Sequence, residues 1–225
     1  MANTHEERQS SIDRLNKNIE KLANAISHFD ENELKRVSFY LLLTINYGIN
    51  NEVENAYTFN NDNIAIHDVG DKYTVDIGKT LDKLKDYDPY SFSVAHNHPN
   101  NILPSKNDFY VFMHNIIFKN MAICGNIGNL YFMKKGKDFH DLIPYKDVDK
   151  LQLDSGKLLK IKVYEFIRKS KKDFYKWLSE TDQDTREKVY QVFSEIIYSD
   201  ICKSIKLFDT GFQYYHEGAE LNESL

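Results

Sequence analysis

The sequence predicts an α+β fold in which helices from both ends of the chain flank a central sheet. Apolar residues repeat at helical spacing over the first fifty residues and again from about residue 147 onward. Between these stretches, short runs rich in β-branched and aromatic residues are separated by turn-forming Asn, Asp and Gly. We therefore expect an N-terminal helical segment at 1–50, an α+β core at 51–140, and a C-terminal helical segment at 141–225 packed on that core.

Two helices are predicted ahead of the core. In the first, one stripe of apolar residues alternates steps of three and four positions: Ile12, Leu15, Ile19, Leu22 and Ile26. This stripe favours packing on the protein's own core, and a short coiled coil in a homodimer is the alternative. A second helix is expected at about 32–47, with Gly48 ending it.

The first half of the core predicts a β-hairpin. Apolar and polar residues alternate from Val53 to Phe59, a polar turn follows at 60–63, and a second strand begins at Ile64. Three further elements are expected in order: a strand at 73–77, a helix at 79–85 and a strand at 90–95. The last of these strands leads directly to His96.

The second half of the core predicts a helix followed by two strands. Apolar residues at helical spacing run from Phe109 to Ile117, and the helix is expected to give way near Lys119. A strand at 121–124, a turn at 125–129 and a returning strand at 130–133 complete the core.

The C-terminal segment predicts helices at 158–167 and 189–197, because apolar residues recur there at helical spacing. The aromatic-rich stretch at 211–216 is expected to pack on the core as a helix or a strand, and an interaction surface is the alternative. Neither helical region contains a motif that points to chemistry.

Composition excludes several classes of protein. The 225 residues are 41% hydrophobic and carry a formal net charge of −5, so a folded chain is expected and a general basic face for nucleic acid is not. The two cysteines, Cys124 and Cys202, are far apart and form no metal-type spacing. No run approaches the roughly 20 apolar residues of a membrane span, and we expect a cytoplasmic protein with free thiols.

The stretch from His96 to Asp108 predicts a metal site. His96 and His98 are two residues apart at a strand end, so both imidazoles lie on one face of the strand and can reach one ion. Asp108 can supply a third ligand if the loop 99–104 folds back and Asp108 lies in the first turn of the next helix. Two imidazoles and one carboxylate leave zinc an open position for water, as in catalytic sites.

A glutamate is the expected general base. Glu52 and Glu54 are two residues apart on the first predicted strand and would share a face, so either can accept the proton of the metal-bound water. Ser105 can donate a hydrogen bond to the developing oxyanion. For Ser105 and Asp108 alone, helix capping is the simpler interpretation, and capping would also fix Asp108 where a ligand is needed.

These elements resemble the motif of the JAB/MPN (JAMM) metallopeptidase family: an upstream Glu, His-x-His-Pro, a short loop and Ser-x-x-Asp. The matching residues are Glu54, His96-Asn97-His98-Pro99 and Ser105-Lys106-Asn107-Asp108. The resemblance covers about 51–135 and is closest to the RadC-like and phage or mobile-element branches. Six residues separate His98 from Ser105, where better-known members have seven.

The resemblance implies a curved sheet flanked by helices and a zinc ion held by His96, His98 and Asp108. It also implies that Glu54 activates the water and that Ser105 contacts the oxyanion, with Glu52 as the alternative base in a RadC-like register. The implied activity is cleavage of peptide or isopeptide bonds, for many members next to ubiquitin-like modifiers. By analogy, the chain is expected to be phage or mobile-element encoded.

Two rival interpretations remain open at this stage. A non-enzymatic module with the same fold would use its helical ends to bind a host defence protein or a virion protein. A metal-dependent nuclease is disfavoured by the acidic net charge. Retention of every motif residue type favours the hydrolase.

Overall fold

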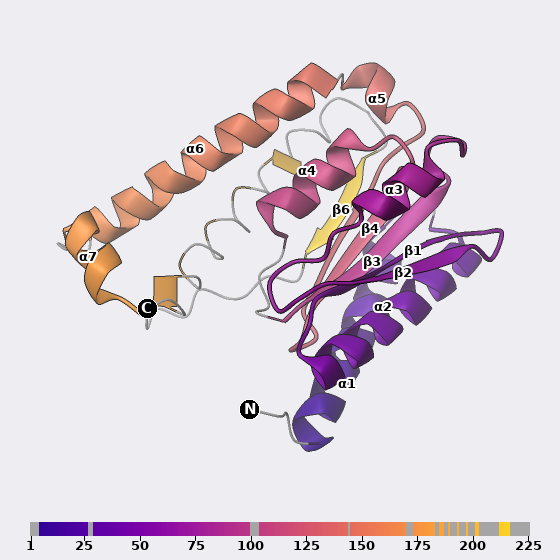
Figure 1. The fold of residues 1–225 in the computed structure, drawn as a ribbon, viewed down its shortest axis with the longest axis horizontal. Coiled ribbons are helices and arrows are strands. Elements are labelled where there is room, and N and C mark those ends of the chain that lie inside the picture. The colour runs from indigo at the N-terminus through magenta and orange to yellow at the C-terminus, as the bar shows by residue number, and fades with distance from the viewer. Residues whose placement is uncertain are drawn as a thin grey trace.

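The computed structural model describes residues 5–26, 29–99, 104–143, 145–169, 173–182, 185–186, 189, 193, 197, 201–202 and 212–216. In these residues a mixed six-stranded sheet has the strand order β2-β1-β3-β4-β5-β6, with helices on both of its faces (Figure 1). The predicted α+β class and the sheet flanked by helices are therefore confirmed.

The sheet combines antiparallel neighbours with one parallel pair. Its strands are β1 (Asn55–Asn60), β2 (Ala65–Val69), β3 (Phe92–His98), β4 (Phe118–Gly125), β5 (Leu130–Lys134) and β6 (Gln213–His216). β3 and β4 run parallel and are joined through a helix, whereas all other neighbours are antiparallel. The carboxyl ends of β3 and β4 therefore meet at one edge, the usual position of binding sites in such units.

Seven helices have both ends within the described residues, and helices lie on both faces of the sheet. They are α1 (His5–Ala25), α2 (Glu31–Asn51), α3 (Gly78–Leu84), α4 (Lys106–His114), α5 (Phe139–Leu142), α6 (Tyr145–Lys169) and α7 (Phe174–Glu180). α1 and α2 pack on one face through a buried cluster that includes Leu15 and Leu41, while α4 packs on the other face through Phe109 and Phe112 (Figure 1). Every residue of β3 is buried because both of its faces are covered.

The two N-terminal helices are confirmed, but the second one ends later than predicted. The stripe that contains Leu15 and Leu22 is buried in the core shared with α2 and the sheet. α2 passes through Gly48 and ends at Asn51. Gly48 is a buried position inside the helix, and the Asn97 side chain fills the space that a Cβ at this position would need. A homodimer contact through α1 stays a prediction.

The strand expected at 73–77 is wrong, because these residues, all of them described, form no strand. The backbone of this segment bonds elsewhere: Thr74 accepts a hydrogen bond from the Asp71 N–H at 3.0 Å, and Val75 donates one to the Glu54 carboxylate. The helix expected to run to about 117 ends at His114, and β4 begins at Phe118.

The C-terminal segment is not purely helical, since it also supplies a strand to the central sheet. β6 pairs with β5 antiparallel, which confirms that the aromatic stretch packs on the core and places it on the sheet edge opposite β2 (Figure 1). The helix expected at 189–197 lies mostly outside the described residues. Within this range, the described residues Val189 and Ile197 are buried. No described helix has the length and apolar character needed to cross a membrane.

Candidate metal centre

β3 brings the two histidines of the motif together. His96 and His98 are 3% and 4% exposed, and their Nε2 atoms lie 3.0 Å apart. Strand alternation sends both imidazoles to the face that carries Val94 and α4, while Asn97 points to the face covered by α2. The strand itself thus orients two imidazole nitrogens toward one point.

α4 adds the carboxylate of Asp108 to the same point. Asp108 Oδ1 lies 3.1 Å from His96 Nε2, and Oδ2 lies 3.0 Å from His98 Nε2. A tetrahedral ion with ligands at about 2.0–2.2 Å keeps those atoms about 3.3–3.6 Å apart, so small adjustments suffice to accommodate zinc. The donor set and its spacing fit the metal predicted from the sequence. Residues 100–103 of the connecting loop lie outside the described residues.

A capping box fixes Asp108 at the start of α4. The Ser105 hydroxyl accepts a hydrogen bond from the Asp108 N–H at 3.2 Å, and Asp108 Oδ2 accepts one from the Ser105 N–H at 2.7 Å. The capping interpretation is therefore confirmed, and metal binding by Asp108 stays a prediction with which this cap is compatible. The Ser105 side chain also lines the cleft beside the histidines, and its contact with an oxyanion stays a prediction.

Glu54 lies immediately before β1 and faces the histidines. Its Oε1 is 3.9 Å from His98 Nε2, and the ligand atoms of Glu54, His96 and His98 all lie within 4.8 Å of one another. The two histidines therefore share the site with two carboxylates. Asp108 touches both imidazoles, whereas Glu54 lies farther from His98, at the distance of a group that acts across a bound water.

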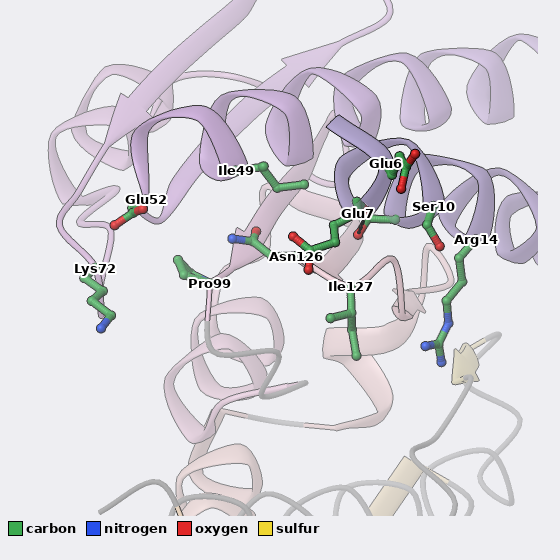
Figure 2. A pocket seen from close by; sticks show the side chains of 11 residues that line it. Glu6, Glu7, Ser10, Arg14, Ile49, Glu52, Lys72, Pro99, Asn126 and Ile127 are labelled. Carbon is green, nitrogen blue, oxygen red and sulfur yellow. Dashed lines mark hydrogen bonds between the residues drawn. The ribbon is translucent and has the colours of Figure 1, made fainter. Parts of the chain in front are cut away.

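Glu52 is separated from this cluster, so the prediction that it shares a strand face with Glu54 is wrong. Glu52 ends α2 in the left-handed conformation, with φ of 55°, and no strand includes it. Its exposed side chain lines a different hollow together with Lys72 (Figure 2). The reversal of direction at Glu52 is what lets the chain leave the helix and enter β1 with Glu54 facing the histidines.

Burial and charge act differently on the two carboxylates. Burial raises the pKa of Glu54, and the nearby imidazoles only partly offset that effect. Burial alone would also raise the pKa of Asp108, but the charges and hydrogen bonds of His96 and His98 outweigh it and hold that pKa well below its usual value. One carboxylate is thereby kept ionised, while the other is better suited to accept a proton.

The cluster opens into a cleft of about 610 Å³. Apart from the cluster itself, this cleft is lined largely by apolar side chains, among them Ala56, Val75, Ile77, Leu81, Val111 and Met121. A larger hollow, about 760 Å³, lies between α1, the end of α2 and the turn at Asn126 and Ile127 (Figure 2). Its lining is mostly exposed and lacks the histidines, so the smaller cleft is the candidate site.

Sequence reasoning missed Asn97 and Gly48, which support the site from behind. The Asn97 amide binds the chain on both sides of Glu54, and Gly48 leaves room for that amide. Alternation along β3 already sends Asn97 to the other face. The sequence does not show what it meets there, because the partners come from segments more than 40 residues away.

Comparison of the chain with protein-family models, curated proteins and solved structures found no match.

Proposed function

We propose that this protein is a zinc-dependent hydrolase that cleaves peptide or isopeptide bonds in the cytoplasm. The proposal rests on one observation: His96, His98 and Asp108 converge to within 3.0–3.1 Å, and a fourth residue faces them with a more distant carboxylate. A structural zinc site would fill all four positions with tightly held ligands. Three close ligands and a set-back acid are typical of a hydrolytic site.

In this proposal His96, His98 and Asp108 hold the metal, which when bound supplies an activated water and polarises the substrate carbonyl. Glu54 accepts the proton of the attacking water on its carboxylate and returns it to the leaving amine nitrogen. Its raised pKa suits both steps, because it makes the carboxylate a stronger base and lets Glu54 hold the captured proton until the leaving nitrogen takes it.

Two observations support a peptide-like substrate. The cleft is lined mainly by apolar side chains, and the chain carries a net charge of −5, which disfavours polyanionic substrates. The resemblance of the motif to JAB/MPN metallopeptidases adds an isopeptide next to a ubiquitin-like modifier as the proposed bond, and a phage or mobile element as the proposed source. Binding of a host defence or virion protein without catalysis is the competing proposal.

Metal content tests the first part of this proposal. Purified protein dialysed against zinc is expected to retain about one ion per chain, and the His96→Ala and Asp108→Ala variants are expected to lose it. His114→Ala is the matched control, because this histidine lies at the far end of α4 and outside the cluster. Folded wild-type protein that retains no zinc at neutral pH contradicts the proposal.

Peptide cleavage tests the second part. Zinc-loaded protein is incubated with a peptide library and with a ubiquitin-like protein fused to a peptide, and new termini are identified by mass spectrometry. Glu54→Gln is expected to keep zinc and lose activity by about 10²–10⁴-fold, the usual contribution of a general base. Glu52→Gln is the matched control and should keep activity. Zinc-loaded wild-type protein that cleaves neither substrate favours the binding module.

A further inference from the structure

Asn97 lies between the two histidines of β3 and points away from them, into the interface with α2. It is fully buried, and its side-chain amide spans two neighbouring backbone groups. The Asn97 Oδ1 accepts a hydrogen bond from the Asn55 N–H at 2.9 Å, and its Nδ2 donates one to the Val53 carbonyl at 3.1 Å. One amide thus binds the chain directly before and directly after Glu54.

The same short segment is held from its other side by backbone bonds. The Glu54 N–H donates to the Asp71 carbonyl at 2.6 Å, and the Glu54 carbonyl accepts from the Gly70 N–H at 2.9 Å. On the other side of the segment, the Asn97 side-chain amide makes the hydrogen bonds that the peptide group of a neighbouring strand would otherwise make. Because residues along an extended chain alternate, Asn55 points toward α2 and Glu54 points into the cleft.

α2 fixes the position of the Asn97 amide in turn. A Cβ at Gly48 would lie 2.1 Å from Asn97 Nδ2, so only glycine leaves room for the amide at this point of the helix. The Asn55 side chain joins the same contact, donating to Asn97 Oδ1 at 2.6 Å and to the Thr44 carbonyl at 3.0 Å. Helix, amide and chain segment therefore form one buried unit.

We infer that Asn97 is a positioning residue for the general base: it acts through the backbone on either side of Glu54 and sets where the Glu54 carboxylate stands relative to the histidines. This inference rests on the proposed function. A base must lie within hydrogen-bond reach of the proton it takes, and a misplacement of about 1 Å can cost roughly 100-fold in rate. Asn97 itself touches neither the proposed ligands' nitrogens nor the cleft.

A small probe tests this without a known substrate. Acetohydroxamic acid binds zinc through two oxygens, and its N–OH proton passes to a neighbouring base, which here is the Glu54 carboxylate. Titration calorimetry on zinc-loaded protein is expected to show about 10-fold weaker binding for both Glu54→Gln and Asn97→Ala, with one zinc per chain retained. The double variant is expected to bind no more weakly than Glu54→Gln alone, because both changes act on one group.

Two further variants keep the outcome independent of a general loss of stability. Gly48→Ala displaces Asn97 without removing its amide and is expected to weaken hydroxamate binding in the same way. Asn120→Ala is the matched control, since Asn120 is also a fully buried sheet asparagine but contacts Glu33 and Ser93 instead, and it should leave the affinity unchanged.

Hydroxamate affinity that is unchanged in Asn97→Ala and Gly48→Ala overturns the inference. The inference is also overturned if Asn97→Ala weakens hydroxamate binding as much in the Glu54→Gln protein as in wild type. Either result leaves the zinc hydrolase proposal standing. Wild-type protein that takes up no zinc overturns the proposed function and this inference together.

Discussion

Asp108 serves two purposes at once, since the carboxylate that caps α4 also touches both histidines. Its Oδ2 accepts the Ser105 N–H and lies 3.0 Å from His98 Nε2, while Oδ1 lies 3.1 Å from His96 Nε2. The capping box fixes this side chain before any ion binds, and a fixed ligand avoids part of the ordering cost of binding. The two purposes can be separated by substitution.

Ser105→Ala and Asp108→Asn should therefore differ in what they lose. Ser105→Ala removes the cap contact and is expected to lower the free energy of unfolding by about 1 kcal/mol while one zinc per chain is retained. Asp108→Asn keeps an oxygen for the Ser105 N–H but removes the charge, and should weaken zinc binding by at least about 10-fold. Urea unfolding of metal-free protein and zinc competition with a chelator measure the two effects. Equal zinc affinities in the two variants would contradict this division.

At the scale of residues, the convergence of His96, His98 and Asp108 could be predicted from sequence, whereas Glu54 was preferred over Glu52 only through the resemblance of the motif. His96, His98 and Asp108 follow from strand alternation and a capping pattern, both of which are local. The choice between Glu52 and Glu54 depends on a helix that continues to Asn51 and on a left-handed residue after it. Gly48 is the one signal near this helix end in the sequence, and it suggests an earlier end. The glycine is instead required by contact with the Asn97 side chain, which is distant in sequence.

Among the elements, the contact between α2 and β3 depends on the absence of a side chain at Gly48. Alanine normally stabilises a helix by about 1 kcal/mol relative to glycine. Here the added Cβ meets Asn97 Nδ2 at 2.1 Å, so we expect Gly48→Ala to destabilise the metal-free protein by about 1–3 kcal/mol instead. In the Asn97→Ala background the clash is gone, and the same substitution should become neutral or stabilising. Urea unfolding of the four proteins checks this, and additive effects would refute the contact.

Glu33 ties α2 to the sheet through charge. Its carboxylate lies 2.7 Å from Lys119 Nζ and 3.0 Å from Lys134 Nζ, and it accepts a hydrogen bond from Asn120 Nδ2 at 2.7 Å. Burial alone would raise the pKa of Glu33, but these hydrogen bonds and positive charges outweigh it and lower the pKa. The folded state thus holds the Glu33 proton less tightly than the unfolded chain does.

The resulting pH dependence has a definite sign. Stability from Glu33 is fully present above its unfolded pKa of 4.5 and is lost as the pH falls through the lower folded value. Glu33→Gln should cost about 2 kcal/mol at pH 7 and show a smaller loss of stability between pH 5 and 3 than wild type. Glu20→Gln, which alters an exposed carboxyl of α1, is the control and should follow the wild-type curve. Parallel curves for wild type and Glu33→Gln would exclude this explanation.

Among the helices and strands, apolar patterns predicted the elements whose pattern is complete within the element itself. α1, α2, the hairpin and β5 were predicted close to their observed positions, because each displays an apolar stripe, an alternation or, in β5, an uninterrupted apolar run beside a turn. The expected strand at 73–77 failed because strand pairing is a tertiary property, and this segment instead contacts Glu54 and its own turn. α4 ended early for a similar reason: Asn115 is extended, and the chain then enters β4 beside β3.

For the molecule as a whole, the C-terminal segment completes the sheet rather than standing apart from it. β6 covers β5, and Phe212 just before it is 2% exposed and packs near Phe139, with ring centroids 5.8 Å apart. A pairing between segments about 80 residues apart leaves no local pattern, so sequence reasoning could place the aromatic stretch on the core but could not choose the strand.

Phe212 should therefore matter to global stability. Phe212→Ala is expected to lower the free energy of unfolding by about 3 kcal/mol, because a buried aromatic ring is lost and a cavity remains. Tyr175→Ala is the control, since Tyr175 is 77% exposed, and it should change stability little. Thermal and urea unfolding measure both. A Phe212→Ala protein as stable as wild type would show that β6 is not part of the folded core.

In the proposed site, three residues bind the ion and a fourth acts on its water. Anomalous diffraction at the zinc edge, from crystals of the zinc-loaded protein, locates the ion relative to all four side chains. We expect one peak about 2.0–2.2 Å from Nε2 of His96, Nε2 of His98 and an Asp108 oxygen, with the Glu54 carboxylate outside that distance. The absence of a peak there, or a peak bound directly by Glu54 in place of Asp108, would contradict the proposed site.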